Sequence, residues 1–265
     1  MVCIILFNYW YSSNCYQLYI DIKYYMEDNF INKDFNFEEG ELLLFDKPYK
    51  WTSFDVVNKI KVFLKYYCHN PKIKVGHAGT LDPLATGLVI VCTGKKTKQI
   101  QKVQDKNKEY EGVFYLGATT PSFDKETSID SNLGFNSVKE EDIYNAAQQL
   151  TGKIEQYPPL YSAVKIDGVR AYVHARKNNK IAEKKLNPRN IEIFDFDITQ
   201  INLPYVSFKV LCSKGTYIRS LARDFGEIIG CGAYLEELRR TAIGEYRVED
   251  AYDVEKFRDI VMKNY

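Results

Sequence analysis

Apolar residues form short segments along the chain, with two different spacings. Alternation with polar residues, or a short unbroken apolar run, predicts a strand, and apolar residues three or four positions apart predict a helix. The predicted strands are 41–45, 87–92, 109–116, 161–166, 191–198 and 206–212. The predicted helices are 53–67, 95–104, 137–150, 216–229, 232–240 and 253–262. Strands and helices that follow one another without strict βαβ repetition favour an α+β sheet protein.

Cap and turn residues set the boundaries of these elements. Ser53 can cap the N-terminus of the first helix, and Ser137 with Glu140 matches a capping box. Two successive prolines, Pro158 and Pro159, predict an extended segment, and the polar stretch 119–136 predicts a loop.

Composition excludes several classes of protein. The chain has 265 residues, of which 45% are hydrophobic, so it can bury a large core and is neither disordered nor a small disulfide-bonded scaffold. The 36 basic and 35 acidic residues nearly cancel, so any nucleic-acid site must be a local patch. The longest apolar runs, 4–7 and 88–92, are far shorter than the about 20 residues that cross a bilayer. We expect no membrane span.

The cysteine pattern argues against a structural metal and against disulfides. The six cysteines include no C-x-x-C pair and no nearby His or Cys that would complete a tetrahedral zinc set. Their irregular spacing, and the apolar strand around Cys92, are typical of buried thiols. We therefore expect a reducing, cytoplasmic compartment.

The first 25 residues differ from the rest of the chain. They carry six of the 21 tyrosines and only two charged side chains, Asp21 and Lys23, and they lack the features of a secretory signal. We interpret 1–25 as an atypical leader with the natural start at Met26, followed by a polar N-terminal segment, 26–40.

The densest candidate for chemistry is the loop 76–87, which contains three glycines, His77 and Asp82. Glycines allow a ligand to approach the backbone closely, and Pro83 favours an extended Asp82 whose carboxylate projects. The loop does not match a phosphate-binding loop, and a structural turn capped by Asp82 is the alternative reading. A lone carboxylate without a metal set fits nucleophilic catalysis, and Arg219, in the first turn of a predicted helix, is its candidate partner.

Five segments together make a resemblance specific. Their order along the chain resembles that of the TruB family of tRNA pseudouridine-55 synthases, from about residue 41 to 248: Lys47–Pro48, Gly76–Gly87, Pro158–Tyr172, Ser213–Arg219 and Gly232–Thr241. The resemblance implies the pseudouridine synthase fold, with a mixed, mainly antiparallel central sheet flanked by helices.

The resemblance also implies an activity. Such an enzyme isomerises uridine in the T loop of tRNA to pseudouridine without cofactor or metal, breaking the glycosidic C–N bond, turning the uracil and joining C5 to the ribose. Asp82 matches the catalytic aspartate, which either attacks C1′ or removes a ribose proton to form a glycal. The uridine must be flipped out, and Tyr110 matches the aromatic residue that stacks on it and could accept the C5 proton.

The remaining site residues come from the same resemblance. Arg219 pairs with Asp82, and Tyr217 and Leu238 line the pocket, although Leu238 also fits a core position. His77 supports the rearranged T loop. Lys47 and Pro48 brace the active-site loop, the lysine through backbone carbonyls. The alternative is a loop hydrogen bond for His77 and a half-buried strand position for Tyr110. His69 and His174 have no motif support and are predicted at the surface.

We expect the T arm of tRNA as the partner of a monomer, with no guide RNA. Two basic stretches are candidate RNA patches: Lys95, Lys96, Lys98 and Lys102, and Arg170, Arg176, Lys177, Lys180, Lys184 and Lys185. The alternative for each is a solvated face.

Two departures from the family pattern are visible. Lys50 stands where many relatives have a turn glycine, so the turn must accept a side chain. Only about 17 residues follow Val248, so we expect a catalytic domain over 41–250 and a short C-terminal helix over 251–265, without the additional PUA domain. Three other functions remain open: a non-catalytic RNA-binding module, a guide-dependent enzyme of the dyskerin-like branch, and a metal-free hydrolase.

Overall fold

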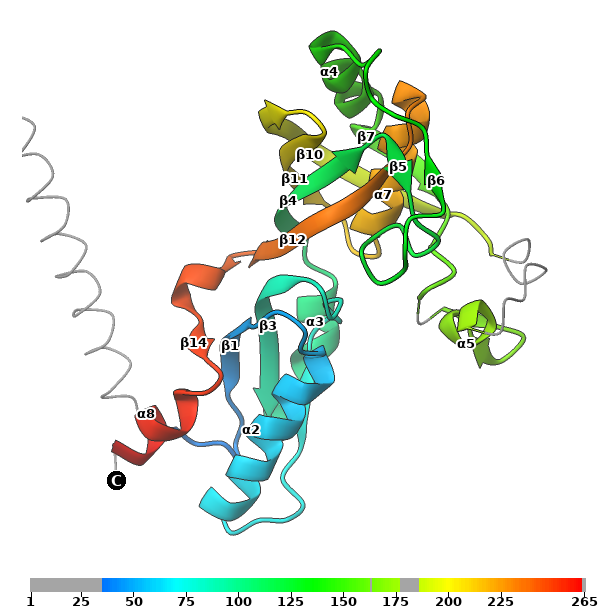
Figure 1. Cartoon of the computed structure of the whole chain (residues 1–265). Coiled ribbons are helices and arrows are strands. Elements are labelled where there is room, and N and C mark those ends of the chain that lie inside the picture. The colour runs from blue at the N-terminus through cyan, green and yellow to red at the C-terminus, as the bar shows by residue number, and fades with distance from the viewer. Residues whose placement is uncertain (1–34, 163, 177–185, 264–265) are drawn as a thin grey trace, which may run out of the picture.

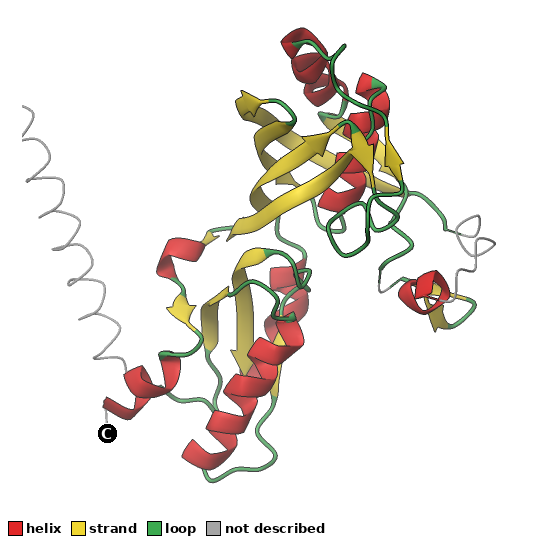
Figure 2. Cartoon of the chain, viewed as in Figure 1, coloured by secondary structure: helices red, strands yellow, loops and turns green. Residues whose placement is uncertain are grey.

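A computed structural model of the chain describes residues 35–162, 164–176 and 186–263. Within these residues ten strands form one sheet, whose main path is β14-β1-β3-β12-β4-β11-β10-β7, with β2 on β3 and β13 on β12 (Figures 1 and 2). The strands are β1 Leu42–Lys47, β2 Val75–His77, β3 Thr86–Thr93, β4 Lys108–Leu116, β7 Gly152–Gln156, β10 Arg189–Asn202, β11 Tyr205–Cys212, β12 Ala233–Ile243, β13 Tyr246–Arg247 and β14 Tyr252–Asp253.

Most neighbouring strands are antiparallel, and only β1 with β14 and β3 with β12 pair in parallel. The predicted α+β class, with a mixed and mainly antiparallel sheet, is therefore confirmed. Two small ribbons lie outside the main sheet: β5 Ala118–Thr119 with β6 Ser131–Asn132, and β8 Lys165–Ile166 with β9 Val169–Arg170.

Helices flank this sheet, apart from α5, which lies to one side of it (Figure 1). They are α2 Ser53–Tyr67, η1 Gly94–Gln99, α3 Ile100–Gln104, α4 Glu140–Gln149, α5 Ala171–Arg176, α7 Ile218–Ile229, η2 Val248–Asp250 and α8 Phe257–Lys263. Among the described residues, no helix combines the length and the apolar character that crossing a membrane requires.

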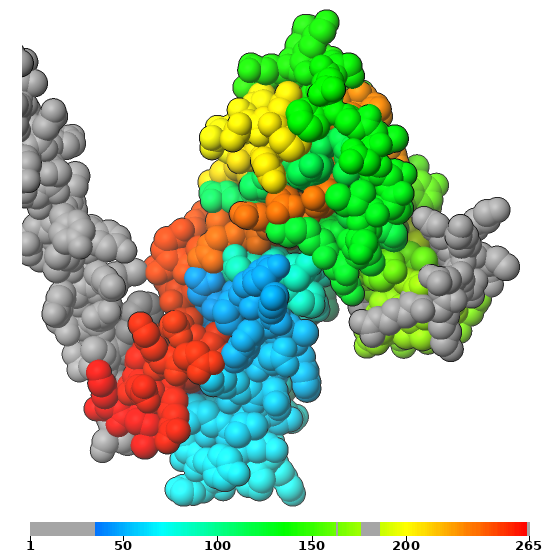
Figure 3. Space-filling view, in the orientation of Figure 1, coloured from blue at the N-terminus to red at the C-terminus, as the bar shows by residue number. Residues whose placement is uncertain are grey.

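The sheet runs through two halves of the molecule. One half contains β1, β2, β3, α2 and α8, the other contains β4, β7, β10, β11, α4 and α7, and β12 passes between them (Figures 1 and 3). β12 pairs with β4 along most of its length, but with β3 only at Arg239–Thr86 and Arg240–Gly87. The segment around α5 projects from the side of the molecule.

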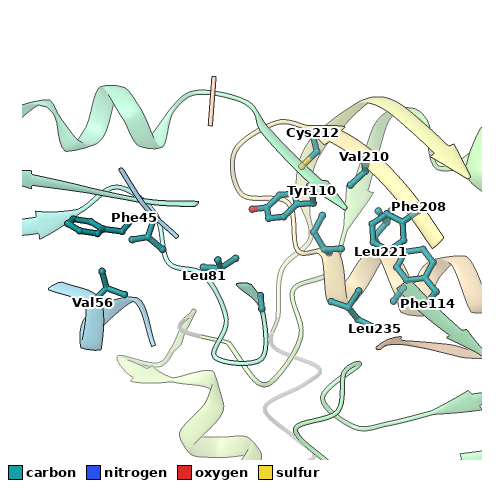
Figure 4. Close-up of a cluster of buried hydrophobic side chains, with 14 of the residues drawn as sticks. Phe45, Val56, Leu81, Tyr110, Phe114, Phe208, Val210, Cys212, Leu221 and Leu235 are labelled. Atoms are coloured by element: carbon teal, nitrogen blue, oxygen red, sulfur yellow. The ribbon is translucent and has the colours of Figure 1, made fainter. Parts of the chain in front are cut away.

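One apolar core continues through both halves. Phe114, stacked on Phe208 at 4.1 Å between ring centroids, fills one end, and Phe45, against Phe257 at 5.0 Å, fills the other (Figure 4). Phe35 and Phe37 are also buried there, although the segment 26–40 was predicted to be polar. The leader 1–25 and residues 26–34 lie outside the described residues.

The prediction of a helix over 232–240 is wrong, because this stretch is the central strand β12. Its sequence is rich in Glu, Leu and Arg, which have high helix propensity. Two irregularities in its pairing with β4, between Leu235 and Glu237 and between Arg240 and Ala242, also interrupt the period-two alternation by which a strand is recognised. Tertiary pairing therefore overrides local preference.

Smaller differences concern element ends. Thr52, not Ser53, caps α2, because its Oγ1 accepts from the backbone N–H of Asp55. α4 begins at Glu140 and not near Ser137, since the Asp142 carboxylate accepts from the Lys139 N–H. The helix expected over 95–104 is a 3₁₀ turn followed by a short α-helix, and 161–166 is a strand only at its end.

A glycine is required where β3 meets β12. Gly87 has φ +106°, and a Cβ there would lie 2.3 Å from the carbonyl oxygen of Arg240. We expect Gly87→Ala to lose about 1–2 kcal/mol of unfolding free energy from the backbone conformation and about 1–3 kcal/mol more from the clash.

Denaturant unfolding measures this loss, with Gly134→Ala as the control. Gly134 also has a positive φ, +74°, but a Cβ there meets nothing within 4 Å. Equal losses in the two variants would contradict the steric argument.

Candidate active site

A cavity of about 940 Å³ lies where the loop after β2 meets the N-terminus of α7. Its walls come from the loop 79–83, the end of α3, the start of β4, residues 161–162, the turn before α7 and β12. Five predicted site residues line it together: Asp82, Tyr110, Tyr217, Arg219 and Leu238.

Asp82 and Arg219 form a two-point ion pair in this cavity. Arg219 Nε donates to Asp82 Oδ2 at 2.8 Å, and Nη2 donates to Oδ1 at 3.2 Å. The Arg219 side chain is only 5% exposed, whereas that of Asp82 is 37% exposed. The carboxylate is therefore held from behind by a planar, permanently charged group while it faces the cavity.

Arg219 also contacts a second carboxylate, which the sequence did not reveal. Its Nε lies 3.6 Å from Oδ2 of the buried Asp124, and its Nη1 donates to the carbonyl oxygens of Tyr161 at 2.9 Å and Ser122 at 3.4 Å. Burial alone would lower the pKa of this guanidinium, but the carboxylates of Asp82 and Asp124 raise it above its usual value. Arg219 therefore joins three loops around one charge.

Lys47 binds backbone carbonyls of the Asp82 loop and of the turn before α2. It is fully buried at the end of β1, and its Nζ donates to the carbonyls of Pro48 at 3.0 Å, Trp51 at 2.7 Å and Pro83 at 3.3 Å, so the contact with backbone carbonyls predicted for it is present. Burial lowers the pKa of this amine to about 8, against the opposing charge of Asp82.

The turn after Lys47 carries a side chain in a conformation that favours glycine. Lys50 has φ 68°, and its N–H donates to Pro83 O at 2.9 Å. The turn thus accepts a lysine in the left-handed region and uses its backbone to hold the active-site loop.

Two further residues fix the same loop. Arg240, which is buried, donates from Nε to Leu88 O at 2.7 Å and from Nη2 to Gly79 O at 3.2 Å. The hydroxyl of Ser53 accepts from the N–H of Leu81 at 2.8 Å. Ser53, first predicted as a helix cap, instead supports the residue next to Asp82.

Tyr110 lies on β4 at the wall of the cavity, opposite Arg240 in the sheet register. Figure 4 shows its hydroxyl directed away from the Phe114 and Phe208 rings. Burial raises the pKa of the Tyr110 phenol, although the neighbouring Arg240 charge opposes this. The phenol is therefore protonated at neutral pH and presents a neutral ring to the cavity.

Tyr217 is fixed by a side chain from a distant strand. Gln156, at the end of β7, accepts from the Tyr217 N–H at 2.8 Å and donates to its carbonyl at 3.1 Å. The guanidinium of Arg189 lies 5.9 Å from the centre of the Tyr217 ring, and Arg189 also lines the cavity. These contacts set the first turn of α7, from which Arg219 projects.

Three predicted site residues do not line the cavity. Lys47 lies beneath its loop, Pro48 is exposed beside that loop, and His77 is a half-buried residue at the end of β2, opposite Val91 of β3. Burial lowers the pKa of the His77 imidazole, so the ring is mainly neutral at pH 7. Of the other histidines, His69 is exposed as predicted, but His174 is half-buried.

The two basic stretches differ in what the structure shows. Lys98 and Lys102 are exposed on η1 and α3 and form no ion pair with a described residue, whereas Lys95 pairs with Glu39 at 2.7 Å. Arg170 is exposed on β9 and Arg176 ends α5, but Lys177, Lys180, Lys184 and Lys185 lie outside the described residues.

The arrangement is suited to chemistry at a carboxylate. Over the described ranges, no group of three His, Cys, Asp or Glu side chains could hold a metal ion. Asp82 presents a carboxylate, oriented by Arg219, at the edge of a cavity with a neutral aromatic wall, which is the arrangement that an oxygen nucleophile or base requires.

Comparison with known families gives two adjoining matches. The model "TruB family pseudouridylate synthase (N terminal domain)" matches residues 65–218, and "tRNA pseudouridylate synthase B C-terminal domain" matches residues 219–265.

Similar curated proteins carry the same description. The chain is 51% identical to tRNA pseudouridine synthase B of Flavobacterium johnsoniae over 222 residues, covering 83% of this chain and 96% of that protein. It is also 51% identical to tRNA pseudouridine synthase B of Phocaeicola vulgatus, covering 84% of this chain and 93% of that protein.

Among solved structures, the chain is similar to one in a Cbf5-Nop10-Gar1 complex, with a TM-score of 0.62 and 29% identity. The match covers 84% of this chain and 54% of that one, so this chain spans about half the length of the solved relative.

The lowered pKa of Lys47 predicts a pH dependence of stability. Between pH 8 and 10.5 the native state has released a proton that the unfolded state keeps, so this residue makes the free energy of unfolding rise with pH in that window. We expect a smaller rise in Lys47→Met.

Denaturant unfolding at pH 8 and pH 10 of both proteins measures the difference. Lys256→Met, at an exposed lysine near the C-terminal helix, is the control and keeps the wild-type slope. The same slope in wild type and Lys47→Met would refute the assignment.

Proposed function

Since the chain belongs to the TruB family of pseudouridylate synthases and is a pseudouridine synthase that acts on tRNA, we propose that its target is the uridine at position 55 in the T loop. The target follows from the resemblance of the motifs, and the observation that supports the chemistry is Asp82, which faces the cavity while Arg219 holds both of its oxygens. The reaction needs one carboxylate that is charged, oriented and open to a ribose.

The isomerisation exchanges one bond for another. The C1′–N1 bond of uridine breaks, the uracil turns in the cavity, the C1′–C5 bond forms, C5 loses its proton and N1 gains one. Asp82 acts at the sugar, either by attack on C1′ or by removal of a ribose proton to give a glycal. In both routes Arg219 keeps the carboxylate in place.

A uridine in a folded loop has to leave its stack to reach Asp82. We infer that the enzyme flips the nucleotide into the cavity of about 940 Å³ and that the Tyr110 ring packs against the uracil. The Tyr110 phenol is protonated at neutral pH, so Tyr110 meets the uracil as a neutral aromatic ring. We expect Leu238 and Tyr217, which also line the cavity, to contact the flipped base.

The surrounding residues contribute to RNA recognition. His77 is uncharged and half-buried near the base of the Asp82 loop, which suits stacking in the space that the flipped base leaves. Lys98 and Lys102 are exposed on η1 and on α3, the helix that contributes Gln101 and Gln104 to the cavity wall, and are available to phosphates. We propose that the protein acts on the T arm as a monomer in the cytoplasm, without cofactor or guide RNA.

The direct test uses an unmodified T-arm hairpin. The purified protein, without metal, nucleotide or guide, should form pseudouridine at the single T-loop uridine, mapped by chemical labelling and primer extension. Product at another uridine, or product only with an added guide, would contradict the proposed target.

Asp82→Asn should abolish product, at least about 1,000-fold below wild type, because a catalytic group is lost without a change in volume. RNA affinity, measured by filter binding, should stay within a few fold. Asp195→Asn changes an exposed carboxylate on β10 and should leave both unchanged. An active Asp82→Asn protein would refute the role of Asp82.

Asp124→Asn should slow turnover by about 10- to 100-fold, because Arg219 loses one of its two carboxylates and with it a fixed position. Its effect should be smaller than that of Asp82→Asn, and single-turnover rates compare the two. A wild-type rate would show that Asp124 is not needed to position Arg219.

A further inference from the structure

We propose that Phe123 and Arg223 are positioning residues for the reaction, which hold the segment 122–124 against Arg219. The proposal rests on the proposed function of the Asp82 site. It extends the set of residues that govern that site to a second turn of α7 and to the wall of a neighbouring cavity.

The two arginines share one face of α7. Arg219 and Arg223 are four residues apart, so their side chains project on the same side of the helix. Arg219 contacts the carbonyl of Ser122 and the carboxylate of Asp124. The Arg223 guanidinium lies 5.0 Å from the centre of the Phe123 ring, in cation–π contact. One face of α7 thus contacts three consecutive residues, Ser122, Phe123 and Asp124.

The segment 122–124 has a backbone conformation at Phe123 that a phenylalanine does not favour. Phe123 has φ 62°, and a bulky residue in the left-handed region persists only where its surroundings impose it. Two backbone contacts help to impose it. Phe123 O accepts from the Leu235 N–H at 2.9 Å, and Asp124 O accepts from the Thr120 hydroxyl at 2.7 Å.

Arg223 is itself fixed, so it can act as a support. Its Nε and Nη2 donate to Asp224 Oδ1 at 2.8 and 2.6 Å, and its side chain is 21% exposed. This pair orients the guanidinium plane beside the ring. A flexible surface arginine would not restrict Phe123 in this way.

The position of these residues separates them from direct catalysis. Phe123 and Arg223 line a second cavity, of about 1080 Å³, and not the cavity around Asp82. Tyr161 lines both cavities, and its carbonyl is a partner of Arg219. They therefore act on Asp82 only through the residues that Arg219 contacts, Ser122, Asp124 and Tyr161, which makes them positioning residues.

The test separates positioning from folding. Phe123→Gly removes the ring but accepts the backbone conformation, and Arg223→Met removes the planar charge. We expect each to lower the single-turnover rate on the T-arm hairpin about tenfold or more, with RNA affinity within about twofold of wild type. The double variant should be no slower than the slower single variant, since both remove one contact.

Two matched variants complete the set. Phe123→Tyr keeps the ring and should retain the wild-type rate, and Arg258→Met changes an exposed arginine on α8 and should also have no effect. Wild-type rates in Phe123→Gly and Arg223→Met would overturn the proposal. The proposal would also be overturned if Phe123→Tyr lost as much of the single-turnover rate as Phe123→Gly. The same holds if RNA affinity fell as much as the rate.

A readout that does not depend on turnover distinguishes this proposal from the proposed function. The Nε–H of Arg219 is buried and bonded to Asp82, so its NMR signal should be protected from exchange with water. We expect faster exchange in Phe123→Gly and in Arg223→Met. Unchanged exchange contradicts the positioning role, whereas absence of product from the wild-type protein contradicts only the proposed function.

Discussion

The site depends on the ion pairs and hydrogen bonds of one buried group, the guanidinium of Arg219. A charge taken out of water must find partners, and a guanidinium that loses one is strongly destabilising. Here the partners are Asp82, Asp124 and two carbonyls, contributed by segments that lie 58 to 137 positions from Arg219 in the sequence. The fold has to bring these segments together at one point, and the same contacts orient the carboxylate that does the chemistry.

The sheet shows what a local pattern can and cannot predict. Strands such as β3 and β4 have a clear apolar signal, and their predicted positions are correct to within a residue or two. β12 was predicted as a helix, because its residues favour helix and its irregular pairing with β4 breaks the alternation. The strand that joins the two halves is thus the one whose conformation is decided by its neighbours.

Some residues of the site could also be predicted from the sequence and others could not. The glycine-rich loop and Asp82 stand out in the sequence, Arg219 was their candidate partner from its charge and its place in the first turn of a helix, and the resemblance to a family implied the same pair. Asp124, Gln156 and Arg240 did not stand out, because each acts by contacts with residues far away in the chain, mostly with backbone groups that no motif records. Ser53 was noticed for the wrong reason, since a serine near a helix start suggests a cap more readily than a loop support.

The short pairing between β3 and β12 has a consequence for the site. Only two residue pairs of the described sheet ladder join these strands, so side-chain contacts, such as those of Arg240 with Leu88 and Gly79, also hold the two halves together along this line. Asp82 follows β2 in one half and Arg219 lies on α7 in the other, so their ion pair is a further contact between the halves. The bond that orients the carboxylate is therefore also part of the cohesion of the molecule, and a substitution that weakens one weakens the other.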